Sequence, residues 1–101
     1  MTEVAGIEIS TDALAEICRR YHVAELSLFG SGVRDDSSED SDIDLLYVIE
    51  RGRRIGWIEV HALQEELTHL FDRPVDLVAK NYLNRHLRDD VLSQARVLYA
   101  A

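Results

Sequence analysis

The chain has 101 residues, 47% of them hydrophobic and 30% charged, with a formal net charge of −8 at pH 7. This length predicts one domain with a modest single core, spanning residues 1–101. The acidic balance argues against a general nucleic-acid surface, because binding a phosphate backbone requires clustered Lys and Arg. No apolar run approaches the ~20 residues that a membrane span requires, and the single cysteine, Cys18, fits a reducing cytoplasm.

The first half of the chain predicts one helix between extended segments. Residues 1–9 are expected to form an extended lead-in, and Ser10 suits the N-cap of a helix that continues to about Tyr21. Residues 23–29 are expected to form the first core strand. Residues 42–49 follow as a second strand, apolar enough after its start to be buried on both faces.

The second half begins with a basic turn at residues 50–56, which leads into the longest helical pattern, at residues 57–71. A short third strand is expected at 75–79, another helix at 83–95 and a short terminal strand at 97–99. Helices that alternate with strands in this way predict an α/β (α+β) domain, in which helices flank a small mixed β-sheet.

The longest predicted helix has one apolar stripe, formed by Ile58, Leu63, Leu67, Leu70 and Phe71. Trp57 opens this helix. We expect its side chain to be a core or interface anchor rather than a platform for base stacking.

The most informative stretch of the sequence joins the first two predicted strands. Gly30-Ser31 ends the first apolar run, and Asp42-Ile43-Asp44 opens the second after ten intervening residues. Successive strand residues alternate faces, so Asp42 and Asp44 should project from one side, roughly 6.5–7 Å apart. Two carboxylates at that spacing can share a pair of metal ions that sit about 3.5–4 Å apart.

A phosphate site is also predicted at the turn after the first strand. Gly30 and Ser31 suit a close backbone approach to the β- and γ-phosphates, and Arg34 would supply a cation for them. Together with the paired carboxylates, these residues predict a metal-bound nucleoside triphosphate. A plain surface arginine is the alternative for Arg34.

Asp76 is a third candidate, because it lies alone in the apolar third strand. A carboxylate beside a core is costly unless it is paired, hydrogen-bonded or bound to metal. If this strand lies beside the second one, Asp76 joins Asp42 and Asp44 on one face, where mutual repulsion should raise at least one pKa. The alternative is that Asp42 caps a turn and Asp76 is an exposed edge residue.

One pattern resembles the signature of the nucleotidyltransferase superfamily with the DNA polymerase β-like catalytic core. It consists of Gly30-Ser31, ten intervening residues and then Asp42-x-Asp44. At this length the chain is similar to the minimal nucleotidyltransferases, the antitoxin partners of HEPN-domain toxins. The resemblance implies that Asp42 and Asp44 hold two Mg²⁺ ions, with Asp76 as the third carboxylate of the metal site. Asp76 would then orient or deprotonate the attacking hydroxyl.

The resemblance also implies a function. A minimal nucleotidyltransferase transfers AMP from its substrate ATP to a tyrosine of the HEPN toxin and so silences it. The chain has no room for an acceptor-binding domain, so the acceptor should come as a separate molecule or be held by an oligomeric neighbour. Transfer to RNA or a small molecule is a weaker option. An acidic loop, formed by Asp35, Asp36, Glu39 and Asp40, would weaken nucleotide binding. The alternative is therefore an inactive or weak enzyme that neutralises the toxin by binding alone.

Overall fold

The computed structural model describes residues 2–4, 6–29, 42–80 and 95–101. Its elements are β1 (Thr2–Val4), β2 (Ile7–Ile9), α1 (Thr11–Arg20), β3 (Val23–Phe29), β4 (Ile43–Ile49), α2 (Trp57–Phe71), β5 (Val75–Ala79) and β6 (Arg96–Ala100). The expected helix at 83–95 lies outside the described residues, except for its last position. Among the described residues, no helix is long and apolar enough to cross a membrane.

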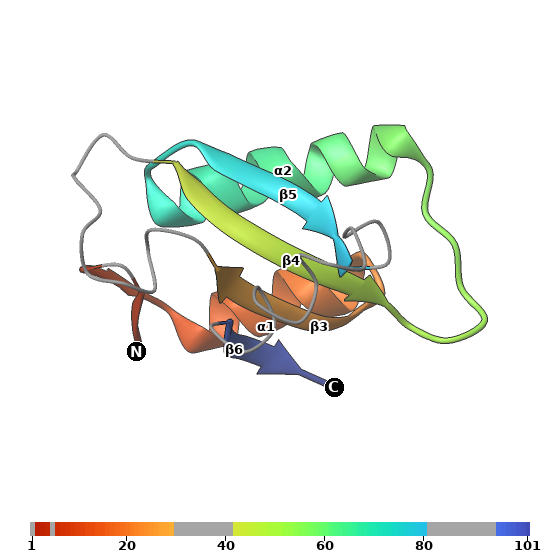
Figure 1. The fold of residues 1–101 in the computed structure, drawn as a ribbon, viewed down its shortest axis with the longest axis horizontal. Helices are drawn as coiled ribbons and strands as arrows, with labels where there is room; N and C mark the ends of the chain where they lie inside the picture. Colours follow the sequence, from red (N-terminus) through yellow and green to blue (C-terminus); the bar gives the residue numbers. More distant parts are fainter. Residues whose placement is uncertain (1, 5, 30–41, 81–94) are drawn as a thin grey trace.

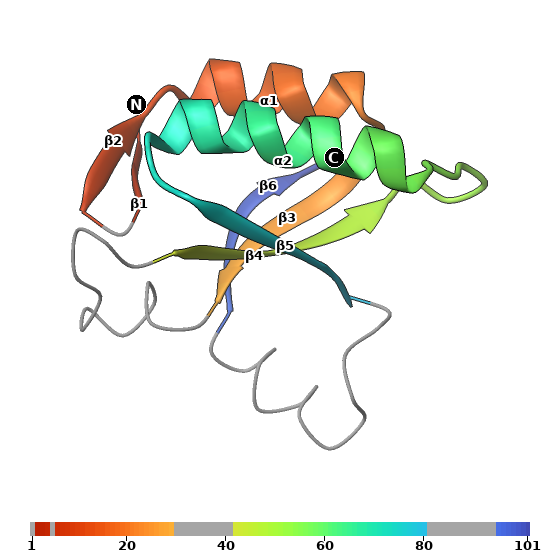
Figure 2. The same ribbon diagram turned by 90° about the horizontal axis from the view of Figure 1, so that it is seen from above.

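Four strands form a mixed sheet in the order β5-β4-β3-β6 (Figure 1). Strand β3 is antiparallel to both β4 and β6, whereas β4 and β5 are parallel. Both helices cover the same face of this sheet (Figure 2). The predicted α+β domain with a small mixed sheet is confirmed.

Helix α1 begins where the sequence predicted. The side chain of Ser10 accepts a hydrogen bond from the backbone N–H of Ala13 at 3.2 Å, which satisfies a donor at the helix N-terminus. Asp12 in the first turn and Arg19 in the last turn both complement the helix dipole. The helix ends at Arg20, and His22 then adopts a left-handed φ of 60°.

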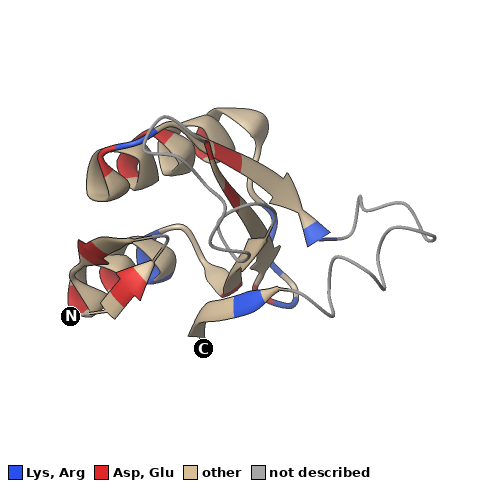
Figure 3. Cartoon of the chain, turned by 60° about the vertical axis from the view of Figure 1, so that its left-hand side comes forward, with Lys and Arg blue, Asp and Glu red and all other residues tan. Residues whose placement is uncertain are grey.

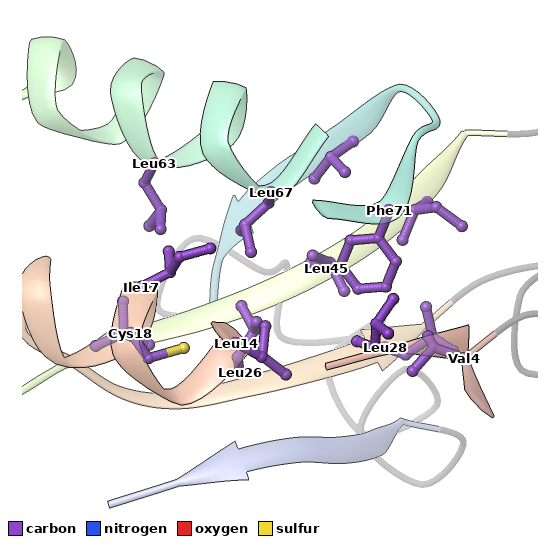
Figure 4. Close-up of a cluster of buried hydrophobic side chains, with 14 residues drawn as sticks. Val4, Leu14, Ile17, Cys18, Leu26, Leu28, Leu45, Leu63, Leu67 and Phe71 are labelled. Carbon is purple, nitrogen blue, oxygen red and sulfur yellow. The ribbon is translucent and has the colours of Figure 1, made fainter. Parts of the chain in front are cut away.

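The core lies between the two helices and the sheet. Leu63 and Leu67 of α2 point toward Ile17 and Leu14 of α1 and toward the strands beneath them (Figure 4). Phe71 completes the buried stripe of α2. The sequence was wrong about Ile58, whose side chain is 66% exposed, and it allowed a core position for Trp57, which is 81% exposed.

The N-terminal residues are more ordered than an extended lead-in. Strands β1 and β2 form an antiparallel hairpin, with Gly6 at a φ of 80° between them. Glycine adopts this left-handed conformation at little steric cost. Val4 and Ile9 are almost fully buried in the main core, so the hairpin closes one end of it.

A polar contact ties the helices together on the surface. Arg20 forms ion pairs with Glu16 of its own helix and with Glu66 of α2. A hydrogen bond with Tyr21 and then the pairing with Arg20 lower the pKa of Glu66. These groups are all solvent-accessible, and we assign them only a small share of the stability.

Candidate active site

The parallel pairing of β4 and β5 brings two of the predicted carboxylates together. Asp44 is the register partner of Asp76, flanked by the pairs Ile43–Val75 and Leu45–Leu77. Register partners on parallel strands project to the same face, about 4.8 Å apart along the hydrogen-bonding direction. Ile43 and Val75 are buried in the core beneath the helices. Asp44 and Asp76 therefore project to the opposite face of the sheet.

Asp42 lies at the start of this arrangement. It precedes β4 and is exposed, while the backbone N–H of the next residue, Ile43, donates to the carbonyl of Pro74 at 2.8 Å. This hydrogen bond extends the pairing of β4 with β5 to the residue that follows Asp42. The charge of Asp42 acts directly on Asp44.

Negative charge on the carboxylates of this face is unfavourable. Burial raises the pKa of the half-buried Asp44 carboxyl, and the negative charges of Asp76 and Asp42 raise it further. Like charges that share a site cannot all ionise without cost, and a bound cation removes the conflict. A proton or a cation at Asp44 would relieve this repulsion.

The three carboxylates suit Mg²⁺ that binds together with a nucleotide better than they suit Mg²⁺ held by protein ligands alone. Among the described residues, no three His, Cys, Asp or Glu side chains converge as a ready-made metal site. Mg²⁺ keeps several waters and commonly binds through one or two carboxylates plus substrate phosphates. Asp42 and Asp44 could supply those carboxylates, with Asp76 beside them.

The phosphate-binding candidates Gly30, Ser31 and Arg34 lie outside the described residues, as does the acidic loop. The structure does describe the strand that leads to them. Phe29, the last residue of β3, is the register partner of Asp44. Strand β3 thus ends directly beside Asp44, and Gly30 and Ser31 are the next two residues in the sequence.

The same face carries a polar cluster that the sequence analysis missed. Ser27 is the register partner of Leu46, two residues after Asp44, and it is buried. Its hydroxyl donates to Glu25 at 3.4 Å, and Lys80 Nζ contacts the same carboxylate oxygen at 3.1 Å. The only signal in the sequence was the polar alternation of Glu25 and Ser27 within an apolar strand.

The chain is similar to proteins of a known family. Residues 12–101 match the polymerase beta nucleotidyltransferase family. The protein adenylyltransferase MntA of Thermococcus cleftensis is 35% identical over 79 residues, which cover 78% of each chain.

Two solved structures share the fold. A toxin–antitoxin crystal structure with AMP-PNP superposes with a TM-score of 0.72 at 22% identity, covering 92% of this chain and 75% of the other. The complex of a tri-AMPylated HEPN toxin with its MNT antitoxin, from Shewanella oneidensis, gives a TM-score of 0.63 at 22% identity, covering 90% of this chain and 70% of the other.

The family match over residues 12–101 identifies the chain as a nucleotidyltransferase. The chain belongs to the polymerase β nucleotidyltransferase family, in its minimal nucleotidyltransferase branch.

Proposed function

We propose that this protein is an antitoxin that transfers AMP from ATP to a tyrosine hydroxyl of a HEPN-domain toxin. The pairing of Asp44 with Asp76 carries the proposal, because it brings two carboxylates together on the face of the sheet opposite α1 and α2. Two comparisons support it: a relative of 35% identity is a protein adenylyltransferase, and fold neighbours are toxin–antitoxin complexes.

Each carboxylate has a distinct role in this proposal. Asp42 and Asp44 would hold two Mg²⁺ ions, with Asp76 completing the set on the neighbouring strand. When bound, these ions would neutralise the charge that develops on the phosphates. Gly30, Ser31 and Arg34 would hold the β- and γ-phosphates, as the sequence predicts.

The reaction is an in-line substitution at the α-phosphorus of ATP. The tyrosine oxygen forms a bond to that phosphorus while the bond to the bridging oxygen of the β-phosphate breaks, and pyrophosphate leaves. The Asp76 carboxylate takes the phenolic proton. The protein contributes mainly positioning and electrostatic stabilisation.

The position of Asp76 suits an acceptor from another molecule. Strand β5 is an edge strand of the sheet, and the Asp76 side chain is exposed. A side chain of a partner protein can therefore approach it without rearrangement of the core.

A second candidate is an antitoxin that neutralises by binding alone. The acidic residues between Gly30-Ser31 and Asp42 favour it, because added negative charge near a triphosphate weakens nucleotide binding. It differs from the first proposal in not requiring any carboxylate of the site.

One experiment separates the two candidates. The protein is incubated with the HEPN-domain protein of the same genome, Mg²⁺ and α-³²P-labelled ATP, and the intact mass of the partner is then measured. The Asp42→Asn/Asp44→Asn double variant is compared with wild type, and with Glu8→Gln/Glu65→Gln, which makes the same chemical change at exposed positions of the hairpin and α2.

The adenylyltransferase proposal expects an AMP increment with wild type and the control variant, and none with the double variant. Toxin neutralisation that persists in the double variant, with no increment from any version, would establish the binding antitoxin instead.

A further inference from the structure

A basic and apolar surface lies at the opposite end of the sheet from the carboxylates. It consists of Arg51, Arg53 and Arg54 in the β4–α2 connection and of Trp57 and Ile58 in the first turn of α2, and we call it the arginine–tryptophan patch. All five residues are exposed, Trp57 by 81% and Ile58 by 66%. Both ribbon views show α2 starting at the end opposite to that where β4 and β5 begin (Figures 1 and 2).

The charge of this patch contrasts with that of the molecule. The chain has 19 acidic and 11 basic residues, yet three arginines fall within the four positions 51–54. Acidic residues instead mark the helices and the N-terminal hairpin (Figure 3). Glu50 and the exposed Glu59 flank the patch, so three arginines against two glutamates leave residues 50–59 with a net charge of +1 on a protein of net charge −8.

The three guanidinium groups are available for an external partner. Within the part of the chain that the structure describes, none of them forms an ion pair. Arg20, by contrast, is engaged by Glu16 and Glu66. An exposed arginine without an internal carboxylate can bind a partner carboxylate through two parallel hydrogen bonds.

The turn that presents the arginines is anchored at its base. The N–H of Glu50 donates to the carbonyl of His22 at 2.8 Å, and the N–H of Arg53 donates to the carbonyl of Glu50 at 3.0 Å. Gly52 has a φ of 83°, which permits the tight reversal between them. The backbone of the patch is thus organised before any partner binds, which lowers the entropy cost of docking.

We propose that the arginine–tryptophan patch is a docking surface for an acidic segment of the toxin, remote from the site of AMP transfer. Trp57 and Ile58 would fill an apolar pocket of the toxin, and the arginines would pair with carboxylates around that pocket. Tryptophan and arginine are the residues most enriched among interface hot spots. This proposal rests on the toxin partner of the proposed function.

Two other occupants fit the patch less well. A symmetric dimer through this surface would set the arginines of one copy against those of the other. A nucleic acid would use the arginines but would leave the exposed Ile58 without an apolar partner. An acidic protein surface with an apolar centre uses all five side chains.

The separation of the two sites has a kinetic consequence. Strand β4 alone extends about 20 Å between the carboxylates and the patch. A helical toxin can contact both, because 20 residues of helix extend about 30 Å. The patch should therefore determine affinity for the toxin without touching the reacting atoms, and its loss should raise KM much more than it lowers kcat.

Trp57 allows docking to be observed directly, because it is the only tryptophan of the chain. The protein is labelled with 5-fluorotryptophan and titrated with the HEPN-domain protein of the same genome, without ATP. We expect the single ¹⁹F resonance to shift and to lose its solvent-isotope sensitivity as the toxin covers the indole. Trp57→Ala and Arg51→Glu/Arg53→Glu/Arg54→Glu should each weaken toxin binding by about tenfold or more.

The control is Arg19→Glu, which reverses one exposed charge on α1, compared with the single variant Arg53→Glu. The docking proposal is overturned if Arg53→Glu and Trp57→Ala bind the toxin as wild type does. It is also overturned if the resonance responds to protein concentration or to single-stranded RNA at physiological salt but not to the toxin.

These outcomes are independent of catalysis, because binding is also measured with the Asp42→Asn/Asp44→Asn variant. Toxin binding that depends on the patch, without AMP transfer, would contradict only the proposed function. AMP transfer with patch-independent binding would remove only the docking surface.

Discussion

Asp44 in β4 lies directly beside Asp76 in β5, as register partners in the parallel half of the sheet. The core enforces this relationship, because Ile43 and Val75 are buried beneath the helices and leave the next residue of each strand facing outward. A slip of one residue would turn one carboxylate into the core. The same packing that stabilises the fold therefore concentrates negative charge at one place.

That concentration should cost stability when no cation is bound. The pKa of Asp44 is raised above its ordinary 3.8 by burial and then by Asp76 and Asp42. Between 3.8 and the raised value the folded state binds more protons than the unfolded state, so the free energy of unfolding falls as pH rises through this window. At neutral pH the penalty is fully present.

Asp44→Asn should therefore stabilise the protein in EDTA at neutral pH. We expect a modest rise in Tm, because Asp44 is only partly buried and solvent screens much of the repulsion. Thermal unfolding measured between about pH 4 and 8 should show the gain shrinking toward the acidic end. Glu65→Gln, an exposed change on α2, should not reproduce this pattern.

Magnesium with a nucleotide should reverse the order of stability, so that wild type becomes more stable than Asp44→Asn. A ligand that binds only the folded state raises stability according to its concentration relative to Kd. Mg²⁺ with a non-hydrolysable ATP analogue should raise the Tm of wild type and leave Asp44→Asn nearly unchanged. Equal stabilisation of both would show that Asp44 is not a metal ligand.

Replacement of Asp76 should slow the chemical step much more than it weakens nucleotide binding. Asp76→Asn keeps the shape of the side chain but removes the base, so we expect kcat for AMP transfer to fall by about 10²–10⁴. The affinity for Mg²⁺ and ATP should change much less than in Asp42→Asn. A kcat for Asp76→Asn equal to that of wild type would contradict the proton-acceptor role.

The sequence predicted the central elements well because their signals are local. The helix 57–71 and the strands 23–29 and 75–79 were placed at the bounds that the structure shows. Strand alternation predicts that Asp42 and Asp44 project from one side, and this stays a prediction because Asp42 precedes β4. The parallel neighbour of β4 could be stated only as a condition, since pairing between distant strands leaves no mark in a single sequence.

Other features depend on packing that periodicity does not report. Ile58 continues the apolar spacing of α2, yet nothing in the described core lies against it. Strands β1 and β2 have three residues each, too few for a recognisable alternation, and Val4 and Ile9 are buried only because the hairpin folds onto the main core. The bridge between Glu25 and Lys80 joins residues 55 positions apart.

Cys18 should be unreactive in the folded protein. Its side chain is fully buried in α1, and burial raises the pKa of the thiol from 9.0 to about 12. The thiolate is the reactive form, so we expect labelling by a thiol reagent at pH 8 to be slower than for free cysteine by about 10³ or more. Labelling should become fast in denaturant, and fast labelling in native buffer would show that α1 opens readily.

The Glu25–Lys80 bridge should hold the edge strand β5 to the centre of the sheet. Lys80 Nζ follows β5 and reaches Glu25 in β3 at 3.1 Å, with the two side chains 24% and 34% exposed. A partly buried pair of this kind should be worth more than a surface pair, and we expect Lys80→Met to cost on the order of 1 kcal/mol. Part of that cost is the Glu25 charge left without its cation.

A double-mutant cycle measures the coupling itself. Lys80→Met, Glu25→Gln and the double variant are compared by urea unfolding, and the double variant should be more stable than the sum of the single losses predicts. Ser27 should increase the coupling between Lys80 and Glu25, because its buried hydroxyl donates to the same Glu25 carboxylate. Strictly additive losses would mean that the two side chains contribute independently, and that main-chain pairing with β4 and the burial of Val75 hold the edge strand without help from this bridge.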